Sequence, residues 1–397
     1  MRQFFLIFLS LLFLGFLSQA HAVDWEEIEK KAKGQTVYFN AWGGSQPINE
    51  YIQWAGRLVQ KKYGVRVIHV KATDIGDVVS RILVEKAAKK LQNGSVDLMW
   101  INGENFKAMK ENTLLFGPFS QNLPHFQKVD NQKKTLKYDF TVPVDNLESP
   151  WGMAQLVFSY DTSQVLKHPE TMSDLLAFAK KHPGKFTYPA IPSFHGTTFI
   201  KQALSELIHD PKILSQKVSQ SDFEKNTRPL WDFLDELHPF LWRKGKVFPA
   251  SGSQMLSLLN DNEIFISLSF NPNSVSNAIE NGELPNTIRT YIHKGGTIGN
   301  AHFVAIPFNS SAKPGAMVFA NFLLSPLAQA RKANPKIWGD PSVLDIKKLS
   351  GPDKKLFDDV PKGIATLSAD ELGPGLPEPH VSWVQALEKE WLKKYNK

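Results

Sequence analysis

Hydrophobic and polar residues follow two alternating patterns along the first hundred residues. Residues 36–42 are mostly β-branched or aromatic, as in a strand, and the next segment, 47–63, carries apolar residues at helical spacing. The same succession then repeats twice. Strands that alternate with helices predict right-handed crossovers and a largely parallel sheet covered on both faces. Strands are predicted at 36–42, 65–70 and 96–101, and helices at 47–63, 75–89 and 103–114.

A second α/β series follows a loop-rich segment, 116–150, which contains several prolines and little periodicity. We predict that 153–160 is a strand leaving the first lobe and that 301–306 is a strand returning to it. This passage out and back predicts two lobes joined by at least two crossing strands, the layout of a hinge. Further helices are predicted at 172–181, 198–209, 229–242, 315–332 and 382–395, and further strands at 186–188 and 264–270.

A chain of 397 residues is long enough for two domains of ordinary size. No internal repeat is evident, so the lobes are not predicted to be duplicates. We therefore expect an α/β protein with a signal peptide at 1–22, an N-terminal lobe at 23–150 that 303–335 rejoins, a C-terminal lobe at 151–302, and a C-terminal helical segment at 336–397 that packs on the lobes.

The first 22 residues have the order of a secretory signal peptide. Arg2 supplies positive charge, 4–16 is an apolar block, and 20–22 has the A-x-A form of a cleavage site. Because a membrane helix needs about 20 apolar residues, cleavage after Ala22 is favoured over an uncleaved anchor. The chain contains no cysteine, which removes disulfides, thiolate chemistry and an N-terminal lipid anchor. We expect export to the periplasm as a freely diffusing monomer.

The charge balance gives little support to a nucleic-acid partner. Without the signal peptide the chain carries 45 basic and 39 acidic residues, a net charge of +6, which is modest for this length. The basic residues are dispersed rather than interleaved with aromatic residues. We therefore expect no nucleic-acid partner.

Several loops at predicted strand ends carry glycine, hydroxyl and amide residues beside helix starts. In an open α/β sheet, ligands bind beyond the carboxyl ends of the strands, where helix N-termini offer free N–H groups. The loops of this kind are 42–45, 73–77, 102–106, 148–152, 194–198 and 271–274. Each has a purely structural alternative: a tight turn for Gly43 and Gly44, helix caps for Asp74, Glu104 and Asn105, and packing or hinge roles for Trp42 and Trp151.

The charges of these loops bear on the ligand. They include Asp74, Asp77, Glu104 and Glu148 but no Lys or Arg, and His195 is their only potential cation. A site for phosphate or a dicarboxylate would more often include Arg, whose planar fork matches such anions. A neutral or cationic organic ligand is therefore favoured, although helix N-termini alone are able to hold an anion.

Catalytic signatures are scarce. The sequence contains no G-x-S-x-G elbow and no H-E-x-x-H zinc helix, and its histidines lack metal-ligand spacing. We expect neither an enzyme, nor a cofactor, nor a metal. The alternatives are a secreted hydrolase that acts on a small substrate in the same cleft, or an adaptor with no small ligand.

Several segments resemble a known family. They are 39–44 (Phe-Asn-Ala-Trp-Gly-Gly), 96–106 with its Asn-Gly-Glu-Asn-Phe element, 115–119, 150–152 with Gln155, and 183–189. These are similar to segments of the extracellular solute-binding proteins of ABC importers, and more closely of the YnjB-like branch, which is related to thiamine-, polyamine- and iron-binding members. The resemblance spans nearly the whole mature chain. It implies a two-lobed, type II periplasmic binding fold whose hinge crossings allow closure on a solute, which is delivered to a membrane permease driven by an ATPase.

Such a protein is expected to bind its ligand in the cleft between the lobes. Trp42 and Trp151 are predicted to form aromatic walls, and Glu104 or Asp74 to supply the counter-charge. Ser45, Asn102 and Thr197 are predicted hydrogen-bond partners. The complete set of predicted ligand-binding residues is Trp42, Gly43, Gly44, Ser45, Asp74, Asn102, Glu104, Asn105, Trp151, Gln155, His195, Thr197 and Asn271.

Overall fold

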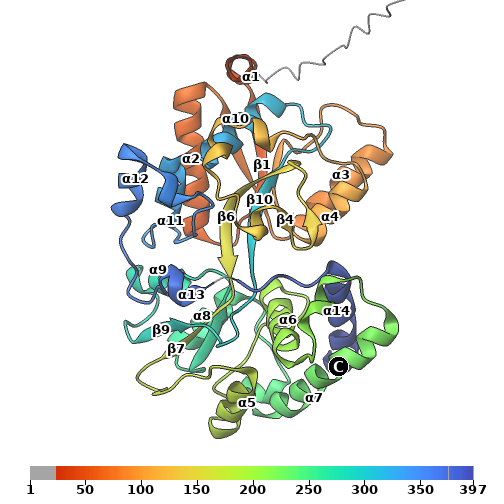
Figure 1. Ribbon diagram of the computed structural model, residues 1–397, viewed down its shortest axis with the longest axis vertical. Helices are drawn as coiled ribbons and strands as arrows, with labels where there is room; N and C mark the ends of the chain where they lie inside the picture. Colours follow the sequence, from red (N-terminus) through yellow and green to blue (C-terminus); the bar gives the residue numbers. More distant parts are fainter. Residues whose placement is uncertain (1–23, 374, 397) are drawn as a thin grey trace, which may run out of the picture.

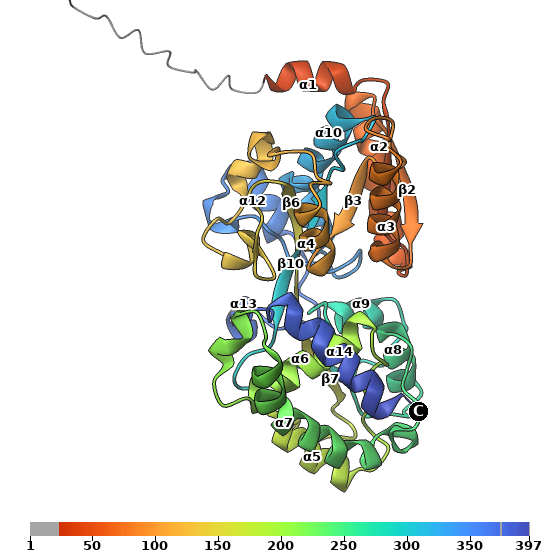
Figure 2. The ribbon, with the colours of Figure 1, turned by 90° about the vertical axis from the view of Figure 1, so that its right-hand side faces the viewer.

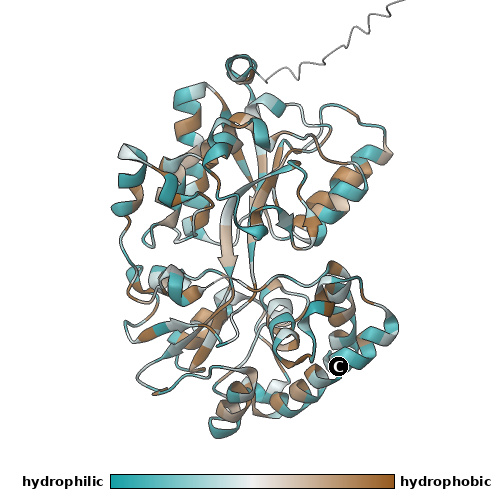
Figure 3. Cartoon of the chain, viewed as in Figure 1, coloured by the Kyte–Doolittle hydropathy of each residue, from teal (hydrophilic) through white to brown (hydrophobic). Residues whose placement is uncertain are grey.

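The computed structural model describes residues 24–373 and 375–396. It consists of two lobes, one above the other in Figure 1, and each has its own hydrophobic core. Brown, hydrophobic positions gather on the strands and inner helix faces, while the outer helix faces are largely polar (Figure 3). None of the described helices has the length and apolarity needed to cross a membrane. The predicted signal peptide, 1–22, lies outside the described residues.

The N-terminal lobe is built on a five-stranded mixed sheet in the order β2-β1-β3-β10-β6. Strand β1 is parallel to β2 and β3, whereas β10 is antiparallel to both of its neighbours, β3 and β6. The parallel part is the one predicted from the alternating pattern. The strands are β1 (Thr36–Trp42), β2 (Arg66–Ala72), β3 (Leu98–Ile101), β6 (Glu148–Gln155) and β10 (Gly299–Ala305), with a small separate hairpin of β4 (Tyr138–Asp139) and β5 (Val142–Pro143).

Helices cover this sheet, and their boundaries follow local sequence signals. The helix that follows β1 ends where Gly64 adopts the left-handed conformation, with φ of 70°. The single helix predicted at 315–332 is two helices, because Pro326 begins a new one that Ser325 caps. The helices are α1 (Trp25–Ala32), α2 (Gln46–Tyr63), α3 (Ile75–Ala87), α4 (Glu104–Glu111), α10 (Lys313–Leu323), α11 (Pro326–Ala333) and α12 (Gly351–Asp358).

The C-terminal lobe has a three-stranded antiparallel sheet, β8-β7-β9, surrounded by helices. The predicted helix at 229–242 begins earlier, because Ser219 provides the N-cap and Pro229 is accommodated inside the helix. The predicted strand at 186–188 is wrong, since Phe186 forms only an isolated bridge to Ile266. The elements are β7 (Val157–Asp161), β8 (Ile266–Ser269), β9 (Ile288–Tyr291), α5 (Met172–Lys181), α6 (Phe194–Leu207), α7 (Gln220–Leu237), α8 (Gly252–Asn260), α9 (Ser274–Glu280) and α14 (Val381–Tyr395), with the short α13 (Ala369–Leu372) near the hinge.

The hinge consists of the connections from β6 to β7 and from β9 to β10. The strand predicted at 153–160 is divided at Leu156, whose N–H donates to Ile298 O at 2.8 Å on the other connection. The Gln155 side chain donates to Thr297 Oγ1 at 3.2 Å and to Leu372 O at 3.0 Å. The C-terminal segment therefore takes part in the hinge as a further crossing between the lobes.

The structure places the lobe boundaries differently from the predicted ones. Residues 151–155 belong to the N-terminal lobe, because β6 pairs with β10 along its whole length. The predicted C-terminal segment is also divided. Trp338, Val343 and Leu344 pack in the core of the N-terminal lobe, whereas α14 packs in the core of the C-terminal lobe through residues such as Trp383.

Candidate functional site

The three parallel strands of the N-terminal lobe end at the edge that faces the other lobe. Figure 2 shows β2 and β3 pointing toward the C-terminal lobe, and β1 runs parallel to both. The residues that follow these strands begin α2, α3 and α4. Gly43 lies in the turn between β1 and α2, beside Trp42 and Gly44. Seven of the predicted site residues are brought to this edge by the three turns: Trp42, Gly44, Ser45, Asp74, Asn102, Glu104 and Asn105.

Trp42 is the exposed aromatic residue at this edge. Its side chain remains 41% exposed, although large aromatic residues are usually mostly buried. The indole lies against Gly44, since a Cβ built at Gly44 would be only 2.4 Å from Trp42 Cζ2. Ser45 follows as the N-cap of α2 but makes no side-chain cap hydrogen bond. The turn thus presents a flat aromatic surface beside a hydroxyl group.

Asp74 and Asn105 lie next to each other at the second and third strand ends. Asp74 is the N-cap of α3, and its Oδ1 accepts a hydrogen bond from Gly76 N at 2.7 Å. A Cβ at Gly76 would lie 3.2 Å from Asp74 Oδ1 and 3.6 Å from Asn105 Oδ1, so both side chains flank this glycine. The capping role predicted as the structural alternative for Asp74 is therefore present, and the carboxylate is still exposed.

Glu104 is the first residue of α4 and its side chain is exposed. Partial desolvation by the surrounding protein raises the pKa of its carboxyl above 4.5, opposed by its own backbone N–H and by Lys201. The negative charges of Glu378 and Asp74 also raise this pKa. Lys201 lies on α6 of the C-terminal lobe, and Glu378 lies in the segment before α14. Glu104 is therefore close enough to interact electrostatically with charges of the other lobe.

On the C-terminal lobe, α6 carries the predicted residues His195 and Thr197. Thr197 is buried and donates to Glu388 Oε1 on α14 at 2.6 Å. Burial raises the pKa of Glu388, the hydrogen bond from Thr197 lowers it, and Glu104 raises it again. His195 packs against Gly252, and burial lowers its pKa to about 4, so its ring is neutral at physiological pH.

Four predicted residues lie elsewhere or serve the fold. Trp151 is wrong as a cleft wall: it is fully buried in the N-terminal core, edge-on to Trp100 at 4.9 Å between ring centroids. Gln155 and Asn271 belong to the hinge region, where Asn271 Nδ2 donates to Trp338 O at 3.2 Å. The segment 148–152 is not a loop but part of β6, which buries Glu148 completely. The backbone of Gly43 donates to Ala72 O at 3.1 Å within the sheet edge.

Sequence reasoning missed a buried ion pair between α6 and the segment that precedes α14. Lys201 Nζ on α6 donates to Glu378 Oε2 at 2.6 Å, and both side chains are almost fully buried. Asn300 at the start of β10 donates to the other oxygen, Glu378 Oε1, at 2.8 Å. Two aromatic residues, Phe140 and Phe194, have their ring centroids 5.1 and 5.8 Å from the ammonium. A lysine flanked by Phe199 and Ile200 on one side and by Ala203 and Leu204 on the other was the available signal.

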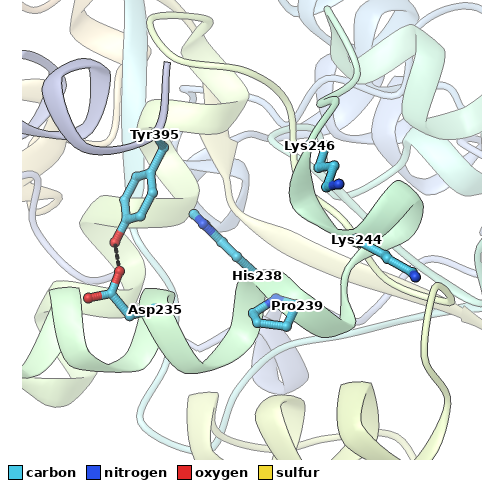
Figure 4. Close-up of a pocket in the computed structure, with 6 residues that line it drawn as sticks. All are labelled: Asp235, His238, Pro239, Lys244, Lys246 and Tyr395. Carbon is cyan, nitrogen blue, oxygen red and sulfur yellow. Dashed lines mark hydrogen bonds between the residues drawn. The ribbon is translucent and has the colours of Figure 1, made fainter. Parts of the chain in front are cut away.

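Two surface cavities, each of about 420 Å³, lie away from these residues. Figure 4 shows the first, on the C-terminal lobe, where Tyr395 donates to Asp235 on one side and Lys244 and Lys246 line the other. The second lies between Asn273, α12 and the segment that follows it. Neither is lined by a predicted site residue.

Comparison with known proteins places this architecture in a family. A family model described as bacterial extracellular solute-binding protein matches residues 53–345. Protein YnjB of Escherichia coli (strain K12) is 46% identical over 386 residues, which cover 96% of this chain and 97% of that protein. The chain belongs to the bacterial extracellular solute-binding proteins.

Solved structures share the fold at low sequence identity. A putative spermidine/putrescine ABC transporter from Listeria monocytogenes has a TM-score of 0.63 and 17% identity, over 91% of this chain and 98% of that chain. The periplasmic binding protein AfuA from Actinobacillus pleuropneumoniae, with exogenous fructose-6-phosphate bound, has a TM-score of 0.62 and 16% identity, over 91% and 99% of the respective chains. The resemblance and the two-lobed fold predicted from the sequence are confirmed.

Membership gives the general function of the chain. It is the solute-binding component of an ABC importer, which binds a small molecule and works with a permease and an ATPase. It is a transport protein rather than an enzyme, so the alternative of a secreted hydrolase is wrong. The family description also places it outside the cytoplasm.

Proposed function

We propose that the chain captures a small organic cation between its lobes, with Glu104 as the counter-charge. The observation that carries the proposal is the mutual position of Glu104 and Glu388. These carboxyl groups come from opposite lobes, and Glu104 raises the pKa of Glu388. A cation held between them would replace a like-charge repulsion by two attractions, and its binding would favour the approach of the lobes.

The remaining charges of this region support a cationic rather than an anionic ligand. Lys201 is the positive group nearest to these acids, but it is already paired with Glu378 and buried. Its charge is therefore offset before any ligand arrives. Asp74 and Glu104 stay exposed at the facing edge, without a side-chain cation among their hydrogen-bond partners in the described residues.

One exposed aromatic residue from each lobe supports the same ligand class. Trp42 is 41% exposed on the N-terminal lobe, and Phe194 is 42% exposed at the start of α6. An ammonium or a flat cation gains from contact with such rings. Ligand binding would begin on one lobe, add contacts to the other, and shift the protein toward a closed form by its differential affinity for that form.

The names of the structural relatives leave the ligand open. One is named for spermidine/putrescine and another holds fructose-6-phosphate, so this fold serves ligands of both charges. The choice for this chain rests on its own carboxylates. We also propose that the protein is periplasmic and monomeric and that its signal peptide is removed after Ala22. It contacts the membrane only through its permease and has no nucleic-acid partner.

Recovery of the native ligand tests the proposal. The protein is purified from the periplasm under mild conditions and examined by native mass spectrometry for a bound small molecule. In parallel, thermal unfolding is followed with putrescine, choline and thiamine, and with fructose 6-phosphate and a neutral sugar as comparisons. We expect a bound amine or quaternary cation and stabilisation by cations alone. Recovery of an anion, or stabilisation only by the phosphate or the sugar, would overturn the cationic assignment.

A further inference from the structure

The hairpin of β4 and β5 holds an aromatic residue in an unusual backbone conformation. Tyr138 pairs with Pro143 and Asp139 with Val142, which leaves Phe140 and Thr141 as a two-residue turn. Phe140 has φ of 52°, a region that suits glycine at the first position of such turns and is rare for a bulky residue. Backbone outliers of this kind persist where surrounding contacts compensate for them and are often functional.

The contacts of Phe140 on its own lobe place it over the N-terminus of α4. A Cβ built at Gly103 would lie 2.8 Å from two carbons of the Phe140 ring, so only glycine permits this approach. The hairpin is fixed there because Gly103 N donates to both carboxylate oxygens of buried Asp139 at 2.8 Å. Glu104, the proposed counter-charge, is the next residue after Gly103. The position of Phe140 is therefore coupled directly to that of Glu104.

The same ring also meets the other lobe. Lys201 Nζ, on α6, lies 5.1 Å from the centroid of the Phe140 ring, within the range of a cation–π contact. That ammonium is held by Glu378, which Asn300 of the crossing strand β10 also binds. The contact is thus anchored beside the hinge, and it joins a group of the N-terminal lobe to a charge of the C-terminal lobe.

We propose that Phe140 is a positioning residue for ligand capture, which sets the approach of the lobes by resting on the Lys201 ammonium. The contact fixes Glu104 relative to Glu388 before ligand arrives, so that less ordering remains for the ligand to induce. The strained turn fits this role because it holds the ring against Gly103 of its own lobe and near the Lys201 ammonium of the other lobe. The role of Phe140 in ligand capture rests on the proposed function, whereas its effect on the geometry of the lobes is measurable without any ligand.

The test measures the distance between the lobes in the ligand-free full-length mature protein. The chain contains no cysteine, so Arg57→Cys on α2 and Glu283→Cys after α9, both exposed, provide unique sites for spin labels. Pulsed dipolar spectroscopy then measures the distance between the labels in the protein with Phe140 and in the protein with 3,4,5-trifluorophenylalanine at position 140. The fluorine atoms weaken the negative potential of the ring face and almost preserve the shape of the ring. Phe140→Gly removes the ring and suits the positive φ, so the hairpin is retained.

We expect the distance distribution to broaden in the order Phe, trifluorophenylalanine, Gly. The ratio of wide to narrow conformers should rise about two- to tenfold, the range that a cation–π contact provides. Phe116, whose ring centroid lies 5.5 Å from Lys313 Nζ within one lobe, is the control, and its fluorination should leave the distances unchanged. Unchanged distances in both Phe140 variants would overturn the proposal. Broadening with Gly but not with the fluorinated ring would overturn the role of the ammonium.

A ligand measurement separates this proposal from the proposed function. If a cation binds, trifluorophenylalanine at 140 should weaken its affinity about two- to tenfold with an unchanged melting temperature. Should no cation bind at all, the distance distributions still decide whether Phe140 positions the lobes. If the Gly variant and the fluorinated protein both lose affinity and both also melt at a lower temperature, Phe140 is a merely structural residue.

Discussion

Lys201 and Glu378 form a buried ion pair with 2.6 Å between Nζ and Oε2, and it joins α6 to the C-terminal segment. The two residues are 177 positions apart in the sequence. Asn300 completes the arrangement by donating to the second carboxylate oxygen. Such a pair is costly to break from one side, because the remaining charge stays in a low-dielectric environment without its partner.

Replacement of Lys201 by Met should therefore destabilise the protein strongly. Loss of one partner of a buried pair costs about 3–5 kcal/mol, which we expect in the free energy of unfolding measured in urea. The double variant Lys201→Met/Glu378→Gln should recover most of this loss, since the Gln carbonyl still accepts from Asn300. A single variant that costs less than about 1 kcal/mol would show that water reaches the pair and screens it.

Replacement of Glu104 by Gln should remove cation affinity without unfolding the protein. The side chain is exposed, so we expect no change in melting temperature, and loss of a charge-assisted contact should weaken binding about 10- to 100-fold by calorimetry. Glu111→Gln, on the exposed far end of the same helix, is the matched control and should bind normally. Equal affinity of both variants would refute the assigned counter-charge.

Cation affinity should depend on pH through the same carboxyl group. Desolvation, only partly opposed by Lys201, raises the pKa of Glu104 above 4.5. A bound cation favours the ionised carboxylate and so lowers this pKa, which means that binding releases a proton. Affinity is therefore full above the raised pKa and falls about tenfold per unit as pH drops below it. Calorimetry from pH 8 to 4 should show this fall in the native protein and a smaller one in Glu104→Gln, which retains Glu388 as a carboxyl group with a raised pKa.

The contrast between Trp42 and Trp151 shows how far the sequence predicts the site. Both tryptophans directly precede a glycine in a segment predicted to lie at the sheet edge, and the local pattern does not distinguish them. The β1–α2 turn is local, so Trp42 is correctly placed at the sheet edge. Trp151 lies in a strand that pairs with β10, about 150 residues later, and this long-range pairing puts it in the core. Lys201 and Glu378 were missed for the same reason, as their pairing has no local signature.

The close approach of Gly44 to Trp42 gives a test of the aromatic surface that changes no charge. Any Cβ at residue 44 would meet the indole at 2.4 Å, so Gly44→Ala must displace the ring. We expect cation affinity to fall about two- to tenfold, as it should in Trp42→Ala, while Trp42→Phe retains most of it.

Gly295→Ala is the matched control for this substitution. A Cβ at Gly295 meets no atom within 4 Å and the residue has no positive φ, so the variant should bind normally and gain slightly in stability. In the double variant Gly44→Ala/Trp42→Ala the loss should equal that of Trp42→Ala alone, because the glycine acts only through the indole. Additive losses in that cycle would mean that Gly44 contributes through its backbone N–H instead, and the aromatic surface would then have a smaller share in binding.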